Sequence, residues 1–462
     1  MRTHRRRRTR TLTWLLGIIL ISSIGVLTLL VRENAAAAMA VAPLYTAAPD
    51  AGLHAEPTQP VVISAGPGAT PVPRPNDTLW RWLSPLEFAP DPRAPEAPLA
   101  NTSVPALTIR LYLPLTLLHY AAPPRQPEAF MALAAPATAD WPAEAGALSG
   151  SRLGLHALGP RDPYIFELIR RARPRLVKSV SDFGWLAEVK QISPDTVTVG
   201  RLYGQDESGV LVLDPQTAAA QYIQERLEQY QLNPAVDYWE GWNEYVFNSA
   251  DQLRWYAEFE AARACQMQAL GFQAAVGGFA VGWPNTYPEM ALFLPALEAA
   301  HRCGGIFHLH EYNKPLMSCG VRTNEAGIIP GAPALKVPAG PLTFRYRFWY
   351  EGYLNARGLG DLPLVLSEYG IDALPAINCP DPDPYNGKTW KDYAGWWQTQ
   401  GLGIDGPNAY VNQLAWADRE MRQDAYVLGA AVFTAGAQDG QWNPYDLHDV
   451  LVPLAHYLTS QP

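Results

Sequence analysis

The sequence predicts an α/β fold, a (β/α)8 TIM barrel preceded by a transmembrane helix and a linker rich in proline and alanine. Three observations support this prediction. An apolar run of about 20 residues lies near the N-terminus, prolines concentrate in the segment after it, and short apolar runs then alternate with longer helical patterns. Eight strands fit into the last ~310 residues, which suits a closed barrel better than an open doubly wound sheet.

The start of the chain has the pattern of a membrane anchor. Residues 1–11 are basic and carry six arginines, and residues 12–31 are almost entirely apolar. Arginines in front of a span place the N-terminus in the cytoplasm and everything after the span outside. Ala-x-Ala sites within residues 35–40 leave a cleaved signal peptide as the alternative. We therefore expect a single-pass protein of the cell membrane with an extracytoplasmic domain, or a secreted protein if the segment is cleaved.

The next segment, residues 32–150, lacks the pattern of a packed domain. Residues 41–150 hold 20 of the 43 prolines, with much alanine and little apolar periodicity. Such a composition cannot easily bury a core, so we predict an extracytoplasmic linker. Residues 107–120 are apolar enough for a small accessory β-unit, which stays an alternative.

Residues 151–462 make up the predicted barrel. The predicted strands are residues 153–158, 175–180, 196–201, 236–241, 273–279, 306–310, 363–368 and 425–434. The predicted helices are residues 163–171, 215–231, 250–270, 287–302, 342–355 and 409–422. No glycine-rich phosphate-binding motif follows the first strand, so nucleotide binding is not expected.

Composition narrows the class of partner. The net charge of the 462-residue chain is −9, and subtracting the six N-terminal arginines leaves −15 for residues 11–462. An acidic chain of this kind does not favour a nucleic-acid partner. The 15 tryptophans and 22 tyrosines suit the flat faces of sugars as well as a protein core. The four cysteines lack metal-binding spacing, so we expect neither a metal site nor a cofactor.

Glutamates follow two opposite strands of the predicted barrel. Glu244 comes after the fourth strand, and Glu368 ends the seventh. Because the active sites of such barrels lie at the C-terminal ends of the strands, the two side chains can face each other across the barrel mouth. Cleavage of a glycosidic bond needs one carboxylic acid to protonate the leaving oxygen and a second carboxylate, about 5 Å away in a retaining enzyme. Proximity would also separate the pKa values of the two groups.

The Asn-Glu pair after the fourth strand and the Glu that ends the seventh resemble the retaining (β/α)8 glycosidases of clan A, also called the 4/7 superfamily. This resemblance covers roughly residues 152–460, and the segment Trp-Glu-Gly-Trp-Asn-Glu at residues 239–244 is similar to the corresponding strand of xylosidase-like families. The resemblance implies that Glu244 is the acid/base, that Asn243 binds the sugar 2-hydroxyl and that Glu368 is the nucleophile.

The resemblance also implies substrate-binding residues. Members of the clan commonly have a Tyr or His after the sixth strand that hydrogen-bonds the nucleophile, and His310 or Tyr312 can fill this place. They often have a Trp under the sugar at the eighth strand. This chain has Phe433 there, so either Phe433 or the later Trp442 would form the floor of the site.

Other polar and aromatic residues of the strand ends are open to two interpretations. Trp242 and Arg201 are candidates for substrate binding, although Arg201 is equally suited to orienting acidic side chains. Glu240 is an alternative to Glu244 as the acid, but it lies four residues deeper in the chain. His308 and His156 can serve the site or simply make hydrogen bonds in the core.

Two long connections are expected to flank the substrate cleft. They are residues 313–340 and 371–408, and the second contains a cluster of Trp and Tyr residues that could stack on sugars or pack against one another. Cys319 and Cys379 lie in these two neighbouring loops, which favours a disulfide between them. The partners of Cys265 and Cys303 stay open.

These patterns favour a retaining glycoside hydrolase that acts on a β-linked oligo- or polysaccharide outside the cell. A non-catalytic cell-surface barrel that binds carbohydrate is the alternative from another class. A third hypothesis is metal-dependent hydrolysis that uses His308, His310 and nearby acids. The sugar, the linkage and the choice between endo and exo action do not follow from the sequence.

Overall fold

The computed structural model describes residues 140–203, 211–372, 379–385 and 387–462. The predicted cytoplasmic segment 1–11, the predicted transmembrane helix 12–31 and most of the predicted linker, including residues 107–120, lie outside these ranges. Within the described ranges, no helix has both the length and the apolar character that a bilayer span requires. The membrane anchor therefore stays a prediction.

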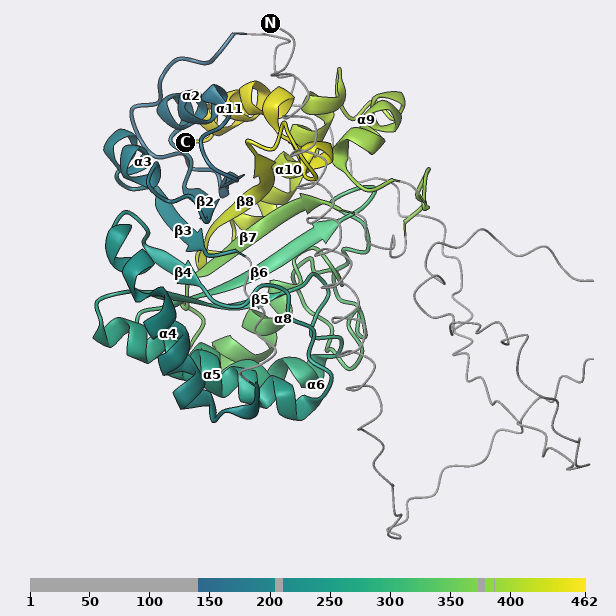
Figure 1. Cartoon of the computed structure of the whole chain (residues 1–462). Helices are drawn as coiled ribbons and strands as arrows, with labels where there is room; N and C mark the ends of the chain where they lie inside the picture. Colours follow the sequence, from purple (N-terminus) through teal and green to yellow (C-terminus); the bar gives the residue numbers. More distant parts are fainter. Residues whose placement is uncertain (1–139, 204–210, 373–378, 386) are drawn as a thin grey trace, which may run out of the picture. The chain divides into compact units, whose positions relative to one another are not determined.

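Eight parallel strands close into a barrel in chain order, with β8 beside β1 (Figure 1). The strands are β1 (Leu153–Ala157), β2 (Leu176–Val180), β3 (Val197–Arg201), β4 (Tyr238–Glu240), β5 (Ala274–Phe279), β6 (Ile306–Asn313), β7 (Leu364–Ile371) and β8 (Val427–Ala435). Leu155 of β1 pairs with Val177 on one side and with Val432 on the other. Each strand overlaps a predicted one, which confirms the barrel fold.

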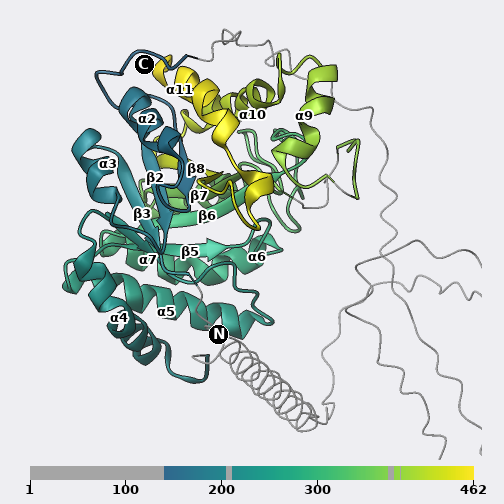
Figure 2. The same ribbon diagram turned by 45° about the horizontal axis from the view of Figure 1, so that its top comes forward.

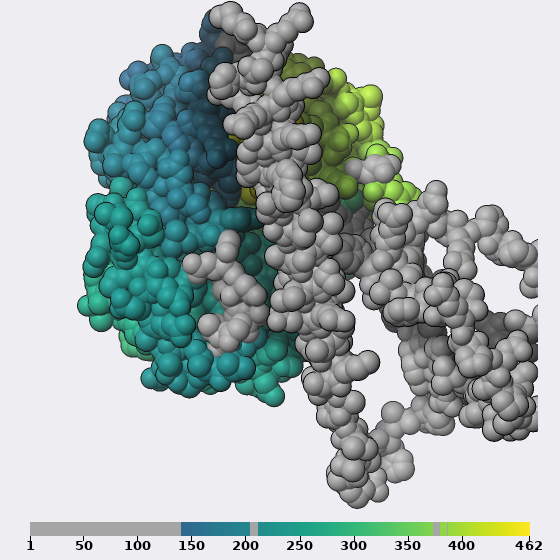
Figure 3. Space-filling view, in the orientation of Figure 1, coloured from purple at the N-terminus to yellow at the C-terminus, as the bar shows by residue number. Residues whose placement is uncertain are grey.

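Helices lie around the outside of the barrel and bury one face against it (Figures 1 and 2). The helices are α2 (Pro163–Ala172), α3 (Leu186–Ile192), α4 (Pro215–Leu232), α5 (Ala250–Ala269), α6 (Tyr287–Met290), α7 (Leu294–Arg302), α8 (Tyr346–Trp349), α9 (Trp390–Thr399), α10 (Gly406–Met421) and α11 (Leu451–Thr459). In the space-filling view, the first half of the barrel (blue to teal) forms one surface, and the region of α9 (yellow-green) lies on the opposite side of the view (Figure 3).

Two predicted helices are interrupted. The range 287–302 contains α6, a 3-10 turn (Ala291–Phe293) and α7, and Pro295 lies in the first turn of α7. Proline lacks a backbone N–H, so it is tolerated there but would break a continuous helix. The range 342–355 becomes helical only at Tyr346, because Phe344 has a φ of 56°, which an α-helix does not contain.

Aspartate followed by proline starts two of the described helices, α2 and α4. Asp162 caps α2 by accepting a hydrogen bond from the backbone N–H of Tyr164, and Pro163 is the first helical residue. Asp214 and Pro215 start α4 in the same way. A side-chain acceptor satisfies an N–H that has no partner within the helix, and proline has the φ angle of a first turn. This local chemistry explains why both helix starts could be predicted from the sequence.

The barrel interior has two different ends. Apolar side chains fill the N-terminal end and are completely buried: Leu176, Val199, Ala275, Ile306, Val365 and Ala431. Ionisable side chains lie nearer the C-terminal end, on β1, β2, β4, β6 and β7, and are also buried: His156, Lys178, Glu240, His308, His310 and Glu368. Alternate residues of a strand point to the same face, so one strand can supply both kinds.

The described part of the predicted linker packs against the barrel. The N–H of Ala145 donates to the carbonyl of Arg171 at 2.7 Å, at the end of α2. The N–H of Gly150 donates to the carbonyl of Gln461 at 3.3 Å, so the residues before β1 lie beside the residues after α11. These contacts attach residues 141–150 to the outer helices.

Candidate active site

Three side chains from three strands meet at the C-terminal end of the barrel. Glu244 follows β4, His310 lies on β6 and Glu368 on β7. One carboxylate oxygen of each glutamate and one ring nitrogen of His310 all lie within 4.8 Å of one another. His310 Nδ1 is 2.7 Å from Glu244 Oε1 and 3.6 Å from Glu368 Oε2. The structure therefore brings the two predicted carboxylates together.

The backbone around Glu244 turns its side chain toward the barrel axis. Glu244 has a φ of 53°, a left-handed conformation that is uncommon for a residue other than glycine. Its N–H donates to the carbonyl of Gly278 at 2.7 Å. Gly278 has a φ of 67°, and a Cβ at this position would lie 2.2 Å from the carbonyl oxygen of Trp242. The close approach of β5 to the segment after β4 thus requires glycine, and it holds Glu244 in place.

Glu368 is held through both of its carboxylate oxygens. Lys178 Nζ donates to Oε1 at 3.2 Å, and the Tyr312 hydroxyl donates to Oε2 at 2.8 Å. Arg201 Nη2 lies 3.7 Å from Oε1, and His156 Nε2 lies 3.8 Å from it. A carboxylate held at both oxygens has a fixed plane, which is what an attacking group requires.

The environment of Glu368 favours its ionised form. Burial would by itself raise the pKa of this carboxyl, but His310, Lys178, His156 and Arg201 together hold the pKa well below its usual range. Burial also raises the pKa of Tyr312 well above its usual range, so its hydroxyl stays protonated and can donate. Glu244 differs from Glu368 in its access to solvent, because its side chain is 37% exposed whereas that of Glu368 is 9% exposed.

Glu240, the alternative acid, lies deeper in the barrel than Glu244 and Glu368. Its side chain is fully buried, and Lys178 Nζ lies 3.0 Å from its Oε2. Burial would raise the pKa of Glu240, yet Lys178, His308 and Arg201 lower it to about 2. A group with this pKa is ionised at neutral pH and has no proton to give to a leaving oxygen. The structure therefore argues against Glu240 as the acid.

Arg201, His156 and His308 contact these acidic side chains. Arg201 Nε lies 3.8 Å from Glu240 Oε2, in addition to the contact of its Nη2 with Glu368. His308 Nδ1 lies 3.0 Å from the Ser367 hydroxyl, and burial lowers the pKa of His308 to about 3. Both histidines are buried and neutral at pH 7, because burial also holds the pKa of His156 well below its usual range. These residues orient the acids.

Asn243 and two aromatic residues lie near the two carboxylates. Asn243 directly precedes Glu244, and its Oδ1 is buried without a hydrogen-bond partner among the described residues. The ring of Phe433 lies 6.1 Å from that of Tyr312 and 5.3 Å from that of Trp442, edge to face in each case. Trp442 is 37% exposed. Both candidates for the floor thus lie together on the β8 side of the site.

Trp242 does not reach the site, which corrects its assignment as a substrate-binding residue. Its ring is 1% exposed. It packs against the rings of Tyr245, Tyr256 and Phe259 at centroid distances of 5.1 to 5.3 Å. The chain leaves the β4 strand before this residue, at Gly241, so the alternation of strand residues no longer applies. Trp242 belongs to the core between the barrel and α5.

The aromatic cluster after β7 packs against itself. Trp390, Tyr393 and Trp397 of α9 are buried, and the ring of Trp397 lies 5.9 Å from that of Tyr410 on α10. Among the aromatic residues of this loop that the structure describes, Tyr385 is the most exposed, at 91%. The cluster is therefore the core of the α9 region.

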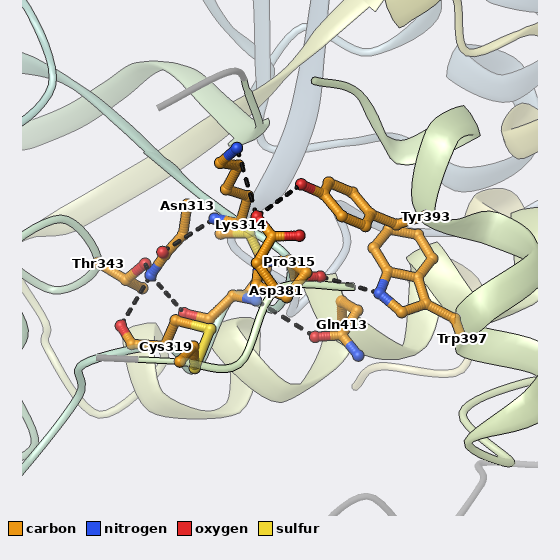
Figure 4. The surroundings of a disulfide bond; sticks show 11 residues. Asn313, Lys314, Pro315, Cys319, Thr343, Asp381, Tyr393, Trp397 and Gln413 are labelled. Carbon is orange, nitrogen blue, oxygen red and sulfur yellow. Dashed lines mark hydrogen bonds and ion pairs between the residues drawn. A yellow bond between two sulfur atoms is a disulfide. The ribbon is translucent and has the colours of Figure 1, made fainter. Parts of the chain in front are cut away.

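Two disulfides join parts of the barrel that are separate in sequence. Cys319 in the loop after β6 is joined to Cys379 in the loop after β7, the pair that the loop positions favour. Figure 4 shows the polar contacts around it: Asn313 Nδ2 donates to the carbonyl of Cys319 at 2.9 Å, and Lys314 Nζ lies 3.3 Å from Asp381 Oδ2. Cys265 on α5 is joined to Cys303 at the end of α7.

Sequence reasoning missed Lys178. It lies in the middle of β2 in the segment Leu-Val-Lys-Ser-Val, and its side chain is completely buried. A lysine at an inward position of a buried strand was the available signal, since lysine is almost never fully buried unless it is paired. Its partners could not be named, because Glu240 and Glu368 lie 62 and 190 residues away in sequence.

Among the residues that the structure describes, two groups of side chains have the geometry to approach a metal ion. They are Glu240 with His308 and His310, and Glu244 with His310 and Glu368. The fixed cations Lys178 and Arg201 already lie beside Glu240 and Glu368. These positive charges would repel a divalent cation, so we assign no metal ligand.

Comparison of the sequence with protein-family models gives no match, and comparison with curated proteins gives none. Solved structures similar to this chain include XacCel5A, with 12% identity over 69% of this chain and 99% of that chain and a TM-score of 0.35. The catalytic domain of a mannanase from Streptomyces sp. SirexAA-E has 17% identity over 68% of this chain and 87% of that chain and a TM-score of 0.31. The tri-modular endo-beta-1,4-glucanase B from Bacillus halodurans has 10% identity over 68% and 59%, with a TM-score of 0.33.

Proposed function

We propose that this protein is a retaining glycoside hydrolase that cleaves a β-linked oligo- or polysaccharide by double displacement. The observation that carries this proposal is the placement of two carboxylates, from β7 and the segment after β4, with oxygens within 4.8 Å of each other. A separation near 5 Å suits a carboxylate that attacks the sugar directly, whereas an inverting enzyme needs room for a water molecule between them.

The different surroundings of the two glutamates assign their roles. Glu368 is buried and ionised, with its plane fixed by Lys178 and Tyr312, so it is the nucleophile. Glu244 is more exposed and is hydrogen-bonded to His310, so it can exchange a proton with a leaving group or with water. The partly exposed Trp442 ring is available to bind the sugar, and Asn243, which directly precedes Glu244, is the candidate partner of the sugar 2-hydroxyl.

The reaction then has two steps. Glu368 attacks the anomeric carbon as the glycosidic C–O bond breaks, and Glu244 gives its proton to the leaving oxygen. In the second step Glu244, now ionised, takes a proton from water, and the water oxygen attacks the anomeric carbon to release Glu368. The configuration at the anomeric carbon is retained.

The nucleophile can be tested by trapping. The protein is incubated with 2-fluoro β-glycosides of several sugars, digested and analysed by peptide mapping. The expected label lies on Glu368, and the glycoside that reacts fastest reports the sugar specificity. A label on another residue would contradict the assignment.

A variant separates catalysis from carbohydrate binding. Glu368→Gln should abolish turnover of polysaccharides and aryl β-glycosides while its circular dichroism and thermal unfolding stay close to the parent's. Glu225→Gln on the exposed face of α4 is the matched control and should keep parental activity. If the parent binds glycans but turns over none of them, the protein is instead a non-catalytic carbohydrate-binding barrel.

We further propose that the barrel works outside the cytoplasm, tethered by residues 12–31. Disulfides persist mainly in oxidising compartments, and all four cysteines are paired. Protease added to intact cells should digest the barrel, whereas a cytoplasmic marker protein survives. Protection of the barrel would contradict the proposed orientation.

A further inference from the structure

We infer that Lys178, paired with Glu240, is a positioning residue whose ammonium group fixes the charge and orientation of the Glu368 carboxylate. This inference rests on the proposed function, because it explains how the nucleophile is kept ready to attack. Nothing in the resemblance to clan A assigned a role to Lys178.

The geometry places Lys178 between two acids. Its Nζ lies 3.0 Å from Glu240 Oε2 and 3.2 Å from Glu368 Oε1, and its side chain has no exposed surface. Tyr312 donates to the opposite oxygen of Glu368. One oxygen of Glu368 is thus tied to an ammonium group and the other to a hydroxyl group, so rotation of the carboxylate would break one of the two contacts.

Lys178 is the cation nearest to Glu368 among the described residues. The titratable groups that face Glu368 or Glu240 come from β1, β3, β6 and the segment after β4: His156, Arg201, Glu244, His308, His310 and Tyr312. Arg201 is a second fixed cation, but its contacts with the two acids are 3.7 and 3.8 Å. His156 and His308 are neutral at pH 7, since burial lowers the pKa of each ring. Lys178 is therefore the fixed cation nearest to the ionised nucleophile, and after His310 it is the group that lowers the Glu368 pKa most.

Glu240 explains how a lysine can stay charged at this depth. A buried ammonium group without a counter-charge loses its proton, because burial disfavours the charged form. Glu240 provides a counter-charge that is itself fully buried and that makes no contact with solvent. Lys178 can therefore stay protonated inside the barrel, because Glu240 as well as Glu368 balances its charge.

Three variants test this role through the pH profile of kcat/KM, whose acid limb reports ionisation of the nucleophile in the free enzyme. Lys178→Met should move the acid limb to higher pH by about one to three units, because the pKa of Glu368 rises when an adjacent opposite charge is removed. Lys178→Arg should keep the limb close to the parent's. Glu240→Gln removes a negative charge near Glu368 and leaves Glu368 itself as the counter-charge of Lys178, so the limb should stay in place or move to lower pH. A purely structural role for the pair would change the profiles of Lys178→Met and Glu240→Gln in the same way.

Lys190→Met is the matched control, because Lys190 also pairs with an acid but lies on α3 away from the site. Its acid limb should match the parent's. Where Lys178→Met leaves Glu240 unpaired and the protein fails to fold, the double variant Lys178→Met/Glu240→Gln removes both buried charges and should still show the upward shift. An acid limb that stays in place in the folded methionine variant would overturn the inference.

A direct titration separates this inference from the proposed function. Glutamate carboxyl carbons are labelled with carbon-13 and followed by NMR against pH, and the spectrum of Glu368→Gln identifies the Glu368 signal. The Glu368 pKa should be higher in Lys178→Met than in the parent. If the parent hydrolyses no glycoside but this difference is found, the proposed function fails and the charge coupling stands. Equal pKa values in the two proteins refute the coupling even if the parent is a glycosidase.

Discussion

The two ends of the barrel interior differ in chemistry although the same strands build both. The N-terminal end is filled by completely buried apolar side chains such as Ile306 and Val365. The C-terminal end holds Lys178, Glu240 and Glu368, with Glu244 at the rim. Burial of apolar surface stabilises the fold, whereas burial of charge opposes it unless each charge is paired. Burial of apolar side chains at the N-terminal end therefore stabilises the barrel. This stability offsets the unfavourable burial of charged side chains at the C-terminal end.

The largest effect should come from removing the proposed acid/base at the charged end. Glu244→Ala should lower kcat by about 10²- to 10⁴-fold for glycosides with poor leaving groups, because no group protonates the leaving oxygen. Activated aryl glycosides should be affected less, and azide should restore turnover by attacking the glycosyl-enzyme. Stability should change little, since the Glu244 side chain lies partly in solvent. An equal loss for all leaving groups, with no response to azide, would refute the assignment.

The next effect concerns the apolar end. Ile306→Ala should lower the free energy of unfolding by about 2 to 5 kcal/mol, because it leaves a cavity in a closely packed interior. The kcat/KM of the folded variant should stay near the parental value. Ile404→Ala is the control, since Ile404 is 63% exposed and its truncation should change stability little. Urea denaturation measures the free energy of unfolding of both variants. If Ile306→Ala lost activity but not stability, the apolar end would not have the purely stabilising role that we assign to it.

A smaller effect should appear in the pH dependence of stability. The folded-state pKa of Glu240 is about 2, below the ordinary value of 4.5. A depressed carboxyl pKa contributes stability that is fully present above the unfolded-state pKa and is lost as the pH falls toward the folded-state pKa. The unfolding free energy of the parent should therefore fall between about pH 4.5 and 2, and Glu240→Gln should show a shallower slope there. If the unfolding free energy of the parent and that of Glu240→Gln fell equally with pH, Glu240 would not have the low folded-state pKa on which this prediction rests.

The smallest effect should come from the aromatic floor. Trp442→Ala should raise KM by up to about tenfold, because stacking of a sugar on an aromatic ring is worth of order 1 kcal/mol. The Trp442 ring is partly exposed beside Phe433, so its loss should leave the fold intact. Tyr385→Ala removes a more exposed ring from the neighbouring loop and should leave KM unchanged. A change in KM for Tyr385→Ala alone would move the sugar-binding surface to that loop.

The fold was predictable because local chemistry marks its elements. Buried apolar runs identified the strands, and the predicted helices 163–171 and 215–231 start at the residues where α2 and α4 begin, each directly after a capping aspartate. The end of β6 was less clear, because the polar segment His-Glu-Tyr-Asn reads as a loop, yet β6 continues to Asn313. The alternation of residues along this segment was the correct signal, since His308, His310 and Tyr312 are two residues apart and all face the site.

The candidate site was predictable in its carboxylates and less so in their supports. Glu244 and Glu368 could be placed from strand order alone. Trp242 was wrong because the strand ends before it, and neither the φ of Glu244 nor the contact with Gly278 can be read from the sequence. Lys178 needed the closed barrel before its partners could be identified. Contacts between distant strands therefore limit what a single sequence reveals about a site.

The pairing of β1 with β8 has a consequence for the order of folding. His156 on the first strand bonds Thr434 on the last, through Nδ1 and Oγ1 at 2.7 Å and across 278 residues. While the chain is still being synthesised, an arc of seven strands has two unpaired edges that can bind other extended chains. The barrel cannot close before the final 36 residues, from Val427 to Pro462, are present, because they contain β8. A protein truncated before Val427 should therefore keep two open sheet edges and aggregate.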